Sequence, residues 1–284
     1  MSGLALRWAG LFALGLALAS PSTVVADDTQ PPDDREIDPV QPDFLVVNLP
    51  TNLRLPRHAF AFALSHRFSR PLGEGDFGDL VSDLFGFDSG AKVGLGLRFG
   101  LFTATEVAVY RTNDRAIQFS AKRDLMQQQQ DSHVLSLGVM ATVEGRDNFS
   151  EIYSPALAVV VSRKLGQRAA LYAVPIFVAN ADADPNRDDD DALLLGLGGR
   201  LLLGHGMALV AEWTPRLAGY DPLDPLDPRQ EAGQNLSFAF EKRVGGHAFQ
   251  LNFSNTFAST FTSLARGATQ NGWFIGFNLS RKFY

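Results

Sequence analysis

The feature that most constrains the fold is an alternation of apolar residues with small or polar residues at a period of two. In residues 91–99 the odd positions are Ala, Val, Leu, Leu and Phe, whereas the even positions are Lys, Gly, Gly and Arg. Residues 135–143, 236–240, 249–253 and 273–279 repeat this pattern. Successive side chains of a β-strand point to opposite faces of the sheet, so the alternation predicts strands with one apolar face.

About twelve segments have the length of a tilted membrane-spanning strand, which needs 9–11 residues. They span about 57–68, 90–99, 104–111, 115–123, 132–144, 153–164, 168–178, 192–203, 206–216, 234–243, 247–256 and 271–283. The segments 153–164 and 168–178 alternate poorly, so the sequence leaves their register open.

The connections between these segments differ in length from one end of the predicted sheet to the other. The long connections are 69–89, 179–191, 217–233 and 257–270. Short connections contain Gly100, Gly166, Gly204 and Gly245. Long loops at one end and tight turns at the other are typical of outer-membrane barrels, and an even strand number places both chain ends on the turn side.

The composition decides which face meets which medium. The chain has 22 Phe, 20% charged residues and a mean hydropathy of −0.02, which is too polar for a bundle of membrane helices. The polar face of the strands is mostly Gly, Ala, Ser, Asn and Gln, which suits a barrel lumen better than a soluble surface. The sequence therefore predicts an all-β fold, a transmembrane antiparallel up-and-down β-barrel of about 12 strands. A membrane helix over Ala192–Ala211 is the weaker alternative because that stretch contains five glycines.

Three parts of the chain are expected. Residues 1–26 have one Arg and an apolar run and read as a cleaved signal peptide, with an uncleaved anchor as the alternative. Residues 27–43 form an acidic, Pro-rich linker that is predicted to be disordered. Residues 44–284 form the barrel domain. In the first long loop, Asp79–Phe87 has helical apolar spacing and predicts a short amphipathic helix, either at the rim or folded inward.

Several segments together resemble an uncharacterised bacterial family of β-barrel, porin-like proteins. The resemblance is carried by Leu55–His58, Ser65–Phe68, Leu84–Ala91, Gly94–Gly100, Val109–Arg111, Gly196–Arg200 and Gly246–Leu251. It covers about residues 50–284 and implies a membrane barrel, but no reaction and no substrate.

The candidate site residues are charged residues on the small, polar face of the alternating strands, which is the predicted lumen face. They are Lys92, Arg98, Glu106, Lys122, Glu144, Arg200, Glu212 and Glu241, and opposite signs among them could pair across the lumen. A weak calcium candidate has the spacing of an EF-hand loop but lacks its glycine and its final glutamate, and it consists of Asp182, Asp184, Asn186 and Asp188. No cofactor is expected, and the absence of cysteine excludes thiolate zinc sites.

The sequence favours passive, porin-like passage of small solutes through the outer membrane of a Gram-negative bacterium. A non-conducting structural or scaffold barrel with a periplasmic partner is the alternative, and an outer-membrane hydrolase using His66 is the third hypothesis. The net charge of −6 argues against a nucleic-acid binder. Expected partners are outer-membrane lipid and lipopolysaccharide, and the barrel-assembly machinery through the aromatic C-terminus.

Charge also differs between the two ends of the predicted barrel. The long connections are mainly acidic, whereas the short-turn side gathers Lys and Arg. The acidic linker 27–43 could therefore dock across the basic turn-side mouth and partly occlude it.

Overall fold

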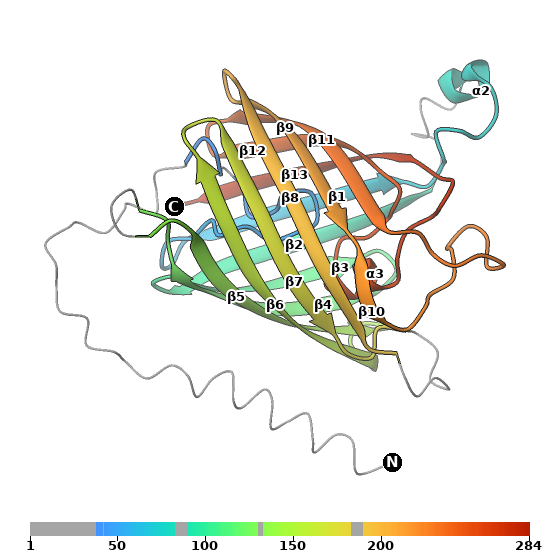
Figure 1. Ribbon diagram of the computed structural model, residues 1–284, viewed down its shortest axis with the longest axis horizontal. Helices are drawn as coiled ribbons and strands as arrows, with labels where there is room; N and C mark the ends of the chain where they lie inside the picture. Colours follow the sequence, from blue (N-terminus) through green and yellow to red (C-terminus); the bar gives the residue numbers. More distant parts are fainter. Residues whose placement is uncertain (1–37, 42, 83–89, 130–132, 183–189) are drawn as a thin grey trace, which may run out of the picture. The chain divides into compact units, whose positions relative to one another are not determined.

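The structure is a computed structural model that describes residues 38–41, 43–82, 90–129, 133–182 and 190–284. Its strands form one antiparallel sheet that closes on itself through β8 and β9 (Figure 1). The strands are β1 (Phe60–Phe68), β2 (Ala91–Phe102), β3 (Thr105–Thr112), β4 (Ile117–Met126), β5 (Ser136–Arg146), β6 (Glu151–Leu165), β7 (Ala169–Val178), β8 (Ala192–Gly204), β9 (Met207–Thr214), β10 (Arg216–Gly219), β11 (Asn235–Val244), β12 (His247–Ser254) and β13 (Phe274–Phe283).

One transmembrane segment is split in two. Pro215 separates β9 from β10, and both pieces pair with β8, so they act as a single interrupted strand. The Leu195 amide donates to the Pro215 carbonyl at 3.0 Å, which keeps the interruption attached to β8. Counted in this way, the described residues form the predicted barrel of twelve antiparallel strands.

The barrel has a turn end and a loop end, as the connection lengths predict. Tight turns join β2 to β3, β6 to β7, β8 to β9 and β11 to β12 at the turn end, where β1 begins and β13 finishes. Helix α2 (Phe77–Ser82) lies in the first long loop, where a helix was expected, although residues 83–87 of the predicted helix lie outside the described residues. Helix α3 (Phe261–Ala265), in the connection 257–270, was not predicted. No described helix has the length and apolarity needed to cross a membrane.

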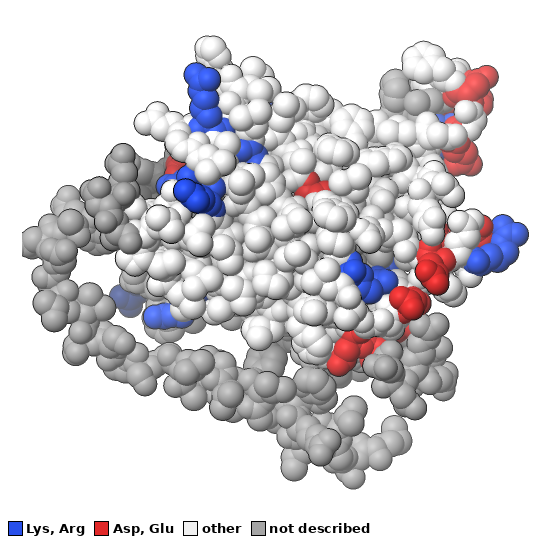
Figure 2. Space-filling view, in the orientation of Figure 1, with Lys and Arg blue, Asp and Glu red and all other residues white. Residues whose placement is uncertain are grey.

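Exposure along the strands follows the predicted parity. In β2 the side chains of Leu95, Leu97 and Phe99 are exposed on the outer face, while Gly94 and Gly96 are buried on the inner face. Charged residues gather at the two ends of the face shown in Figure 2, with a nearly uncharged band between them. The outer wall is therefore an apolar belt of the kind that a bilayer requires.

The poor alternation of two segments has a structural cause. In β6 the inward residues Ala156, Ala158 and Val160 are buried, and in β7 Val174 and Ile176 are fully buried on the inner face. Both faces of these strands are apolar because their inner faces pack against a core inside the barrel. Alternation disappears where the lumen is filled with apolar side chains instead of water.

Part of the lumen is filled by the chain segment that directly precedes β1. We call residues 43–56 the plug, because Val46, Val47 and Leu49 are at most 1% exposed and belong to the same core as the inner faces of β6 and β7. Val40 and Gln41, in the segment expected to be a disordered linker, are buried as well. Val40 belongs to the same core, and residues 44–56 lie inside the lumen rather than in the wall (Figure 1).

The apolar belt gives a prediction about depth. Phe240 lies in the middle of β11 and is 58% exposed, whereas Val244 is the last residue of that strand at the turn end. Arginine on a lipid-facing position costs about 2–4 kcal/mol at the bilayer midplane and about 0–1 kcal/mol near the interface. Phe240→Arg is therefore expected to lower the free energy of unfolding in phospholipid vesicles, measured by urea titration, by about 2–4 kcal/mol. An equal loss from Val244→Arg would contradict this placement.

Candidate functional site: the lumen and its plug

The tip of the plug is a tight turn inside the barrel. The Val46 amide donates to the Leu49 carbonyl at 2.8 Å, and the Thr51 amide donates to the Phe44 carbonyl at 3.0 Å. An isolated bridge between Leu45 and Pro50 completes this short hairpin. The backbone amides of Val47, Asn48 and Leu49 at this turn have no partner within the hairpin, so they need hydrogen-bond acceptors from the wall.

Glu212 of β9 supplies these partners. Its Oε2 accepts from the backbone amides of Val47, Asn48 and Leu49 at 3.0, 2.8 and 2.9 Å. Its Oε1 accepts from the Asn48 Nδ2 at 3.1 Å. Successive amides that converge on one carboxylate oxygen form an anion-binding nest, here occupied by a side chain of the wall. A single carboxylate therefore holds the deepest part of the plug.

A second group of wall residues holds the other side of the tip. The Arg67 Nη2 donates to the Asn48 Oδ1 at 3.0 Å, and its Nη1 donates to the Asn278 Oδ1 at 2.9 Å. The Asn278 Nδ2 donates in turn to the Val47 carbonyl at 2.9 Å. Gln250 donates to the Val46 carbonyl and to the Glu241 carboxylate. Polar side chains of β1, β12 and β13 thus supply hydrogen-bond partners for the part of the plug that faces them.

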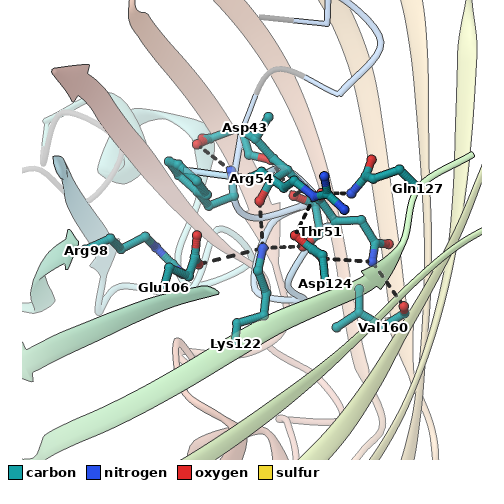
Figure 3. Close-up of polar contacts among 12 residues, drawn as sticks. Asp43, Thr51, Arg54, Arg98, Glu106, Lys122, Asp124, Gln127 and Val160 are labelled. Carbon is teal, nitrogen blue, oxygen red and sulfur yellow. Dashed lines mark hydrogen bonds and ion pairs between the residues drawn. The ribbon is translucent and has the colours of Figure 1, made fainter. Parts of the chain in front are cut away.

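The base of the plug is anchored by charges of β3 and β4 (Figure 3). The Lys122 Nζ donates to the carbonyls of Thr51 at 3.0 Å and Leu53 at 2.7 Å. Glu106 lies 3.7 Å from the same ammonium and 2.8 Å from Arg98. A buried ammonium surrounded by carbonyls and a carboxylate has its charge compensated, which makes this anchor stable inside the barrel.

Asp124 holds the plug beside this anchor (Figure 3). Its carboxylate accepts from the Asn52 Nδ2 at 3.4 Å and pairs with the Arg54 Nε at 3.7 Å. The Gln127 Nε2 donates to the Asn52 carbonyl at 3.0 Å. Charged side chains of β4 and the neutral Gln127 that follows this strand therefore both contact the plug.

Apolar and aromatic contacts fix the same segment. The Phe44 ring lies close to two cations, with Arg98 at 5.2 Å and Lys282 at 5.3 Å from its centroid. A Cβ on Gly196 would come within 2.4 Å of a Leu49 methyl group, so glycine is what lets the plug tip approach β8 this closely. The plug is packed as well as hydrogen-bonded.

The loop that carries α3 fills the lumen from the loop end. Phe261 and Leu264 are buried and join the apolar core, and α3 contacts β6, β7 and β8, although its own loop joins β12 to β13. The Asn235 Nδ2 donates to the Leu264 carbonyl at 2.8 Å, and the Arg216 Nη2 donates to the Ala265 carbonyl at 2.6 Å. This loop therefore crosses the lumen on the loop-end side of the plug.

The predicted lumen charges take two kinds of position. Seven of them are buried or half-buried on the inner face: Arg98, Glu106, Lys122, Glu144, Arg200, Glu212 and Glu241. The eighth, Lys92, lies at the loop end with its side chain 49% exposed and pairs with Asp114 at 2.6 Å. Burial raises the pKa of the Asp114 carboxyl, but hydrogen bonds from Lys92 and Thr112 outweigh burial, so this pKa lies below its usual range.

The sequence suggested that opposite charges pair across the lumen. The ion pairs that these residues form instead join strands that lie close together in the wall. Arg98 and Glu106 lie on the adjacent strands β2 and β3, and Arg200 of β8 pairs with Glu241 of β11 across β9. Opposite charges meet along the wall because the plug occupies the space between opposite walls. Their role in lining a pore stays a prediction.

The sequence reasoning missed several residues that hold the plug. Arg67, Gln250 and Asn278 all lie on the inner face, and the parity of their strands would have placed them there. Gln250 and Asn278 are uncharged, so a selection of charged lumen residues does not include them. The plug itself gave no alternating signal because it is not a strand of the wall.

Among the described residues, two adjoining cavities lie between the plug, the α3 loop and the wall on the side of β1 to β5. The outer cavity, at the loop end, has a volume of about 420 Å³, and the inner cavity has about 30 Å³. Both are lined by Ser65 and Ser259, so they adjoin at that level. A third cavity of about 220 Å³ lies between β10 and residues 231–235.

The remaining candidates receive different placements. His66 lies on the outer face, where its ring stacks on Phe277 at 4.9 Å, and among the described residues its Nδ1 has no hydrogen-bond partner. Asp184, Asn186 and Asp188 of the calcium candidate lie outside the described residues, so that prediction stays untested. The described residues contain no cluster of three or more metal-ligating side chains.

The nest at Glu212 gives a prediction for the plug. Glu212→Gln removes the charge that three amides share, and hydrogen bonds to a charged group contribute about 1.5–3 kcal/mol. Hydrogen exchange of the amides of Val47, Asn48 and Leu49, followed by mass spectrometry in detergent micelles, is expected to accelerate about 10- to 100-fold. The control Ser237→Ala removes a lumen hydroxyl that bonds Ser254 in the wall and should leave these amides protected. Unchanged exchange in Glu212→Gln would show that the plug does not depend on this carboxylate.

Solved structures similar to this chain are membrane barrels. The COG4313 outer membrane channel from Pseudomonas putida F1 matches with a TM-score of 0.51 and 13% identity, over 81% of this chain and 97% of that chain. The NanC porin matches with a TM-score of 0.51 and 7% identity, over 80% of this chain and 99% of that chain. Identities this low show the fold alone. No curated protein sequence matches the chain.

The family comparison covers the plug and the whole wall. Residues 43–283 match the family described as a membrane-bound beta barrel domain (DUF5777). The match starts at Asp43, the first residue of the plug, and reaches the last residue of β13. It confirms the family resemblance and the membrane barrel predicted from the alternating strands. The chain belongs to the DUF5777 family of membrane-bound β-barrel domains.

Proposed function

We propose that this barrel lies in the outer membrane of a Gram-negative bacterium and gives small solutes a porin-like passage that the plug narrows. The observation that carries the proposal is the pair of adjoining cavities along β1 to β5. The outer cavity reaches Lys92 and Asp114 at the loop end, and the inner cavity reaches Asp43 and Ser280 near the turn end. The two cavities together follow one side of the wall over most of its height.

The side chains along this route suit a passage. Ala63 and Ser65 on the inner face of β1 stand opposite Gly96 and Gly94 of β2, and the Tyr110 ring of β3 packs over these glycines and lines the inner cavity. The opposite half of the lumen, at β6 to β8, is filled with the apolar core. An asymmetric filling of this kind restricts solutes to one side of the lumen.

The plug sets the width of the route. The inner cavity of about 30 Å³ has room for about one or two water molecules. With the plug seated, the barrel admits water and small ions, and larger solutes pass when the plug tip leaves the Glu212 nest. The docking of the acidic linker 27–43 across the basic turn-side mouth stays a separate prediction, because residues 27–37 lie outside the described residues.

A non-conducting scaffold barrel is the alternative, and the extent of plug anchoring favours it. Buried partners from β1, β4, β9, β12 and β13 all hold the plug, and each would have to be exchanged for water upon opening. The hydrolase hypothesis has no such support, because His66 lies among aromatic rings on the outer face.

A reversible crosslink distinguishes the channel from the scaffold. A Cβ on Gly198 would lie 3.2 and 3.3 Å from the two methyl groups of Val46, which is compatible with a disulfide between Val46→Cys and Gly198→Cys. The chain has no other cysteine. In planar lipid bilayers, the oxidised double variant is expected to keep the smallest conductance level without transitions to larger ones. Reduction should restore the transitions, and Glu212→Gln should make them about tenfold more frequent.

The matched control places a disulfide in the wall. Ser237 and Ser254 face each other on β11 and β12 with their hydroxyls 2.8 Å apart, so Ser237→Cys with Ser254→Cys crosslinks the barrel without touching the plug. This variant should conduct equally in both redox states. If neither the wild type nor Glu212→Gln conducts, the scaffold alternative holds. Equal conductance of the locked and reduced plug would show that the plug does not gate the passage.

A further inference from the structure

The outer cavity contains charges that the plug and the wall do not use. It is lined by Glu144 and Arg146 of β5 and by Arg266, which follows α3 in the loop across the lumen. Glu144 and Arg146 are two residues apart on one strand face, which places them about 6–7 Å from each other along the wall. One acidic and two basic side chains from two distant segments thus meet around one space of about 420 Å³.

The other two charged residues of this cavity, Lys92 and Asp114, have no net charge as a pair. Lys92 and Asp114 form an ion pair at 2.6 Å, and the Thr112 hydroxyl also donates to Asp114. Neither side chain of this pair therefore offers an uncompensated charge to a solute. Glu144, Arg146 and Arg266 line the same cavity and interact electrostatically with one another, so a ligand there meets all three charges.

Unsatisfied atoms of these residues point to a missing partner. Glu144 is 3% exposed, and among the described residues its Oε2 has no hydrogen-bond partner. The Arg266 Nε donates to the Ala181 carbonyl at 2.9 Å, which fixes the guanidinium, whereas its Nη2 is buried without a partner in the described part of the chain. Buried polar atoms normally have partners, so one free acceptor and one free donor beside the same cavity indicate a ligand that carries both kinds of group.

The electrostatics of Arg266 agree with this arrangement. Burial and the nearby Arg146 lower the pKa of the Arg266 guanidinium, whereas Glu144 raises it. Arginine stays charged in proteins, so the two guanidinium groups repel each other across the cavity. A carboxylate held by both would relieve that repulsion and satisfy the Arg266 Nη2.

The surrounding loops select among ligands that carry a carboxylate. The connections 69–89, 179–191 and 217–233 carry 15 acidic and three basic residues. Their field disfavours a simple anion at the loop end, while the two arginines in the cavity disfavour a simple cation. A solute with no net charge but with both charged groups meets neither obstacle.

We infer that the outer cavity binds small zwitterions that carry a carboxylate and an ammonium group, the class that includes the α-amino acids. Arg146 and Arg266 hold the carboxylate, and the free Oε2 of Glu144 accepts from the ammonium. This assignment rests on the proposed function, because it names the solute class that the passage selects. The volume of about 420 Å³ is within the ordinary range of small-molecule pockets.

Calorimetry of the full barrel in detergent tests the site without any need for conduction. Alanine is the probe, and acetate and ethylammonium carry its two charged groups separately. Alanine is expected to bind with a dissociation constant of about 1 mM, at least tenfold tighter than either half. Glu144→Gln should weaken alanine about tenfold and leave acetate unchanged, whereas Arg146→Gln should weaken both.

Folding of the variants is controlled within the same set. Arg146→Gln removes one of the two cations that act on Glu144, while Arg266 stays as the other. Arg229→Gln removes an arginine whose side chain is 89% exposed in the connection 217–233, outside the cavity, and should leave binding unchanged. Acetate binding as tight as alanine, or alanine binding that is insensitive to Glu144→Gln, would overturn the inference. Binding without conductance would refute the passage and not the site, and conductance without binding would refute the site alone.

Discussion

The carboxylate of Glu212 is the interaction on which the interior of this barrel depends. It accepts from three consecutive amides at the tip of the plug, groups that no strand or helix of the chain would otherwise satisfy. Buried amides without partners are costly, so the turn can lie deep in the lumen only because β9 places an acceptor there. The position of Val46 and Leu49 against Gly198 and Gly196 of β8 follows from this attachment.

Once the plug is fixed, the lumen divides into two unequal halves. On one side the plug tip, α3 and the inner faces of β6, β7 and β8 form an apolar core, as in a water-soluble domain. On the other side the adjoining cavities lie along β1 to β5. The same barrel therefore combines a packed interior, which holds the chain in one conformation, with adjoining cavities along the opposite wall.

The alternating pattern of residues predicted the strands closely wherever one face was apolar. In β2, β5, β11, β12 and β13 the predicted ranges agree with the observed strands to within a few residues at each end. The pattern weakened in β6 and β7 because their inner faces pack against apolar residues that come from elsewhere in the chain. Parity also placed Glu106, Lys122 and Glu212 on the inner face, although it could not reveal what they bind there.

The sequence by itself determined the wall of this protein. The alternation of residues within a strand, the length of each turn and the apolar face that a bilayer requires are all set by residues that are close together in the chain. Only the tertiary structure decided what fills the wall. The contacts of Glu212 with residues 47–49, of Arg67 with Asn48 and of Lys122 with Thr51 join positions far apart in the chain. No local pattern encodes such contacts, because they depend on which side chains the closed barrel brings to the same depth.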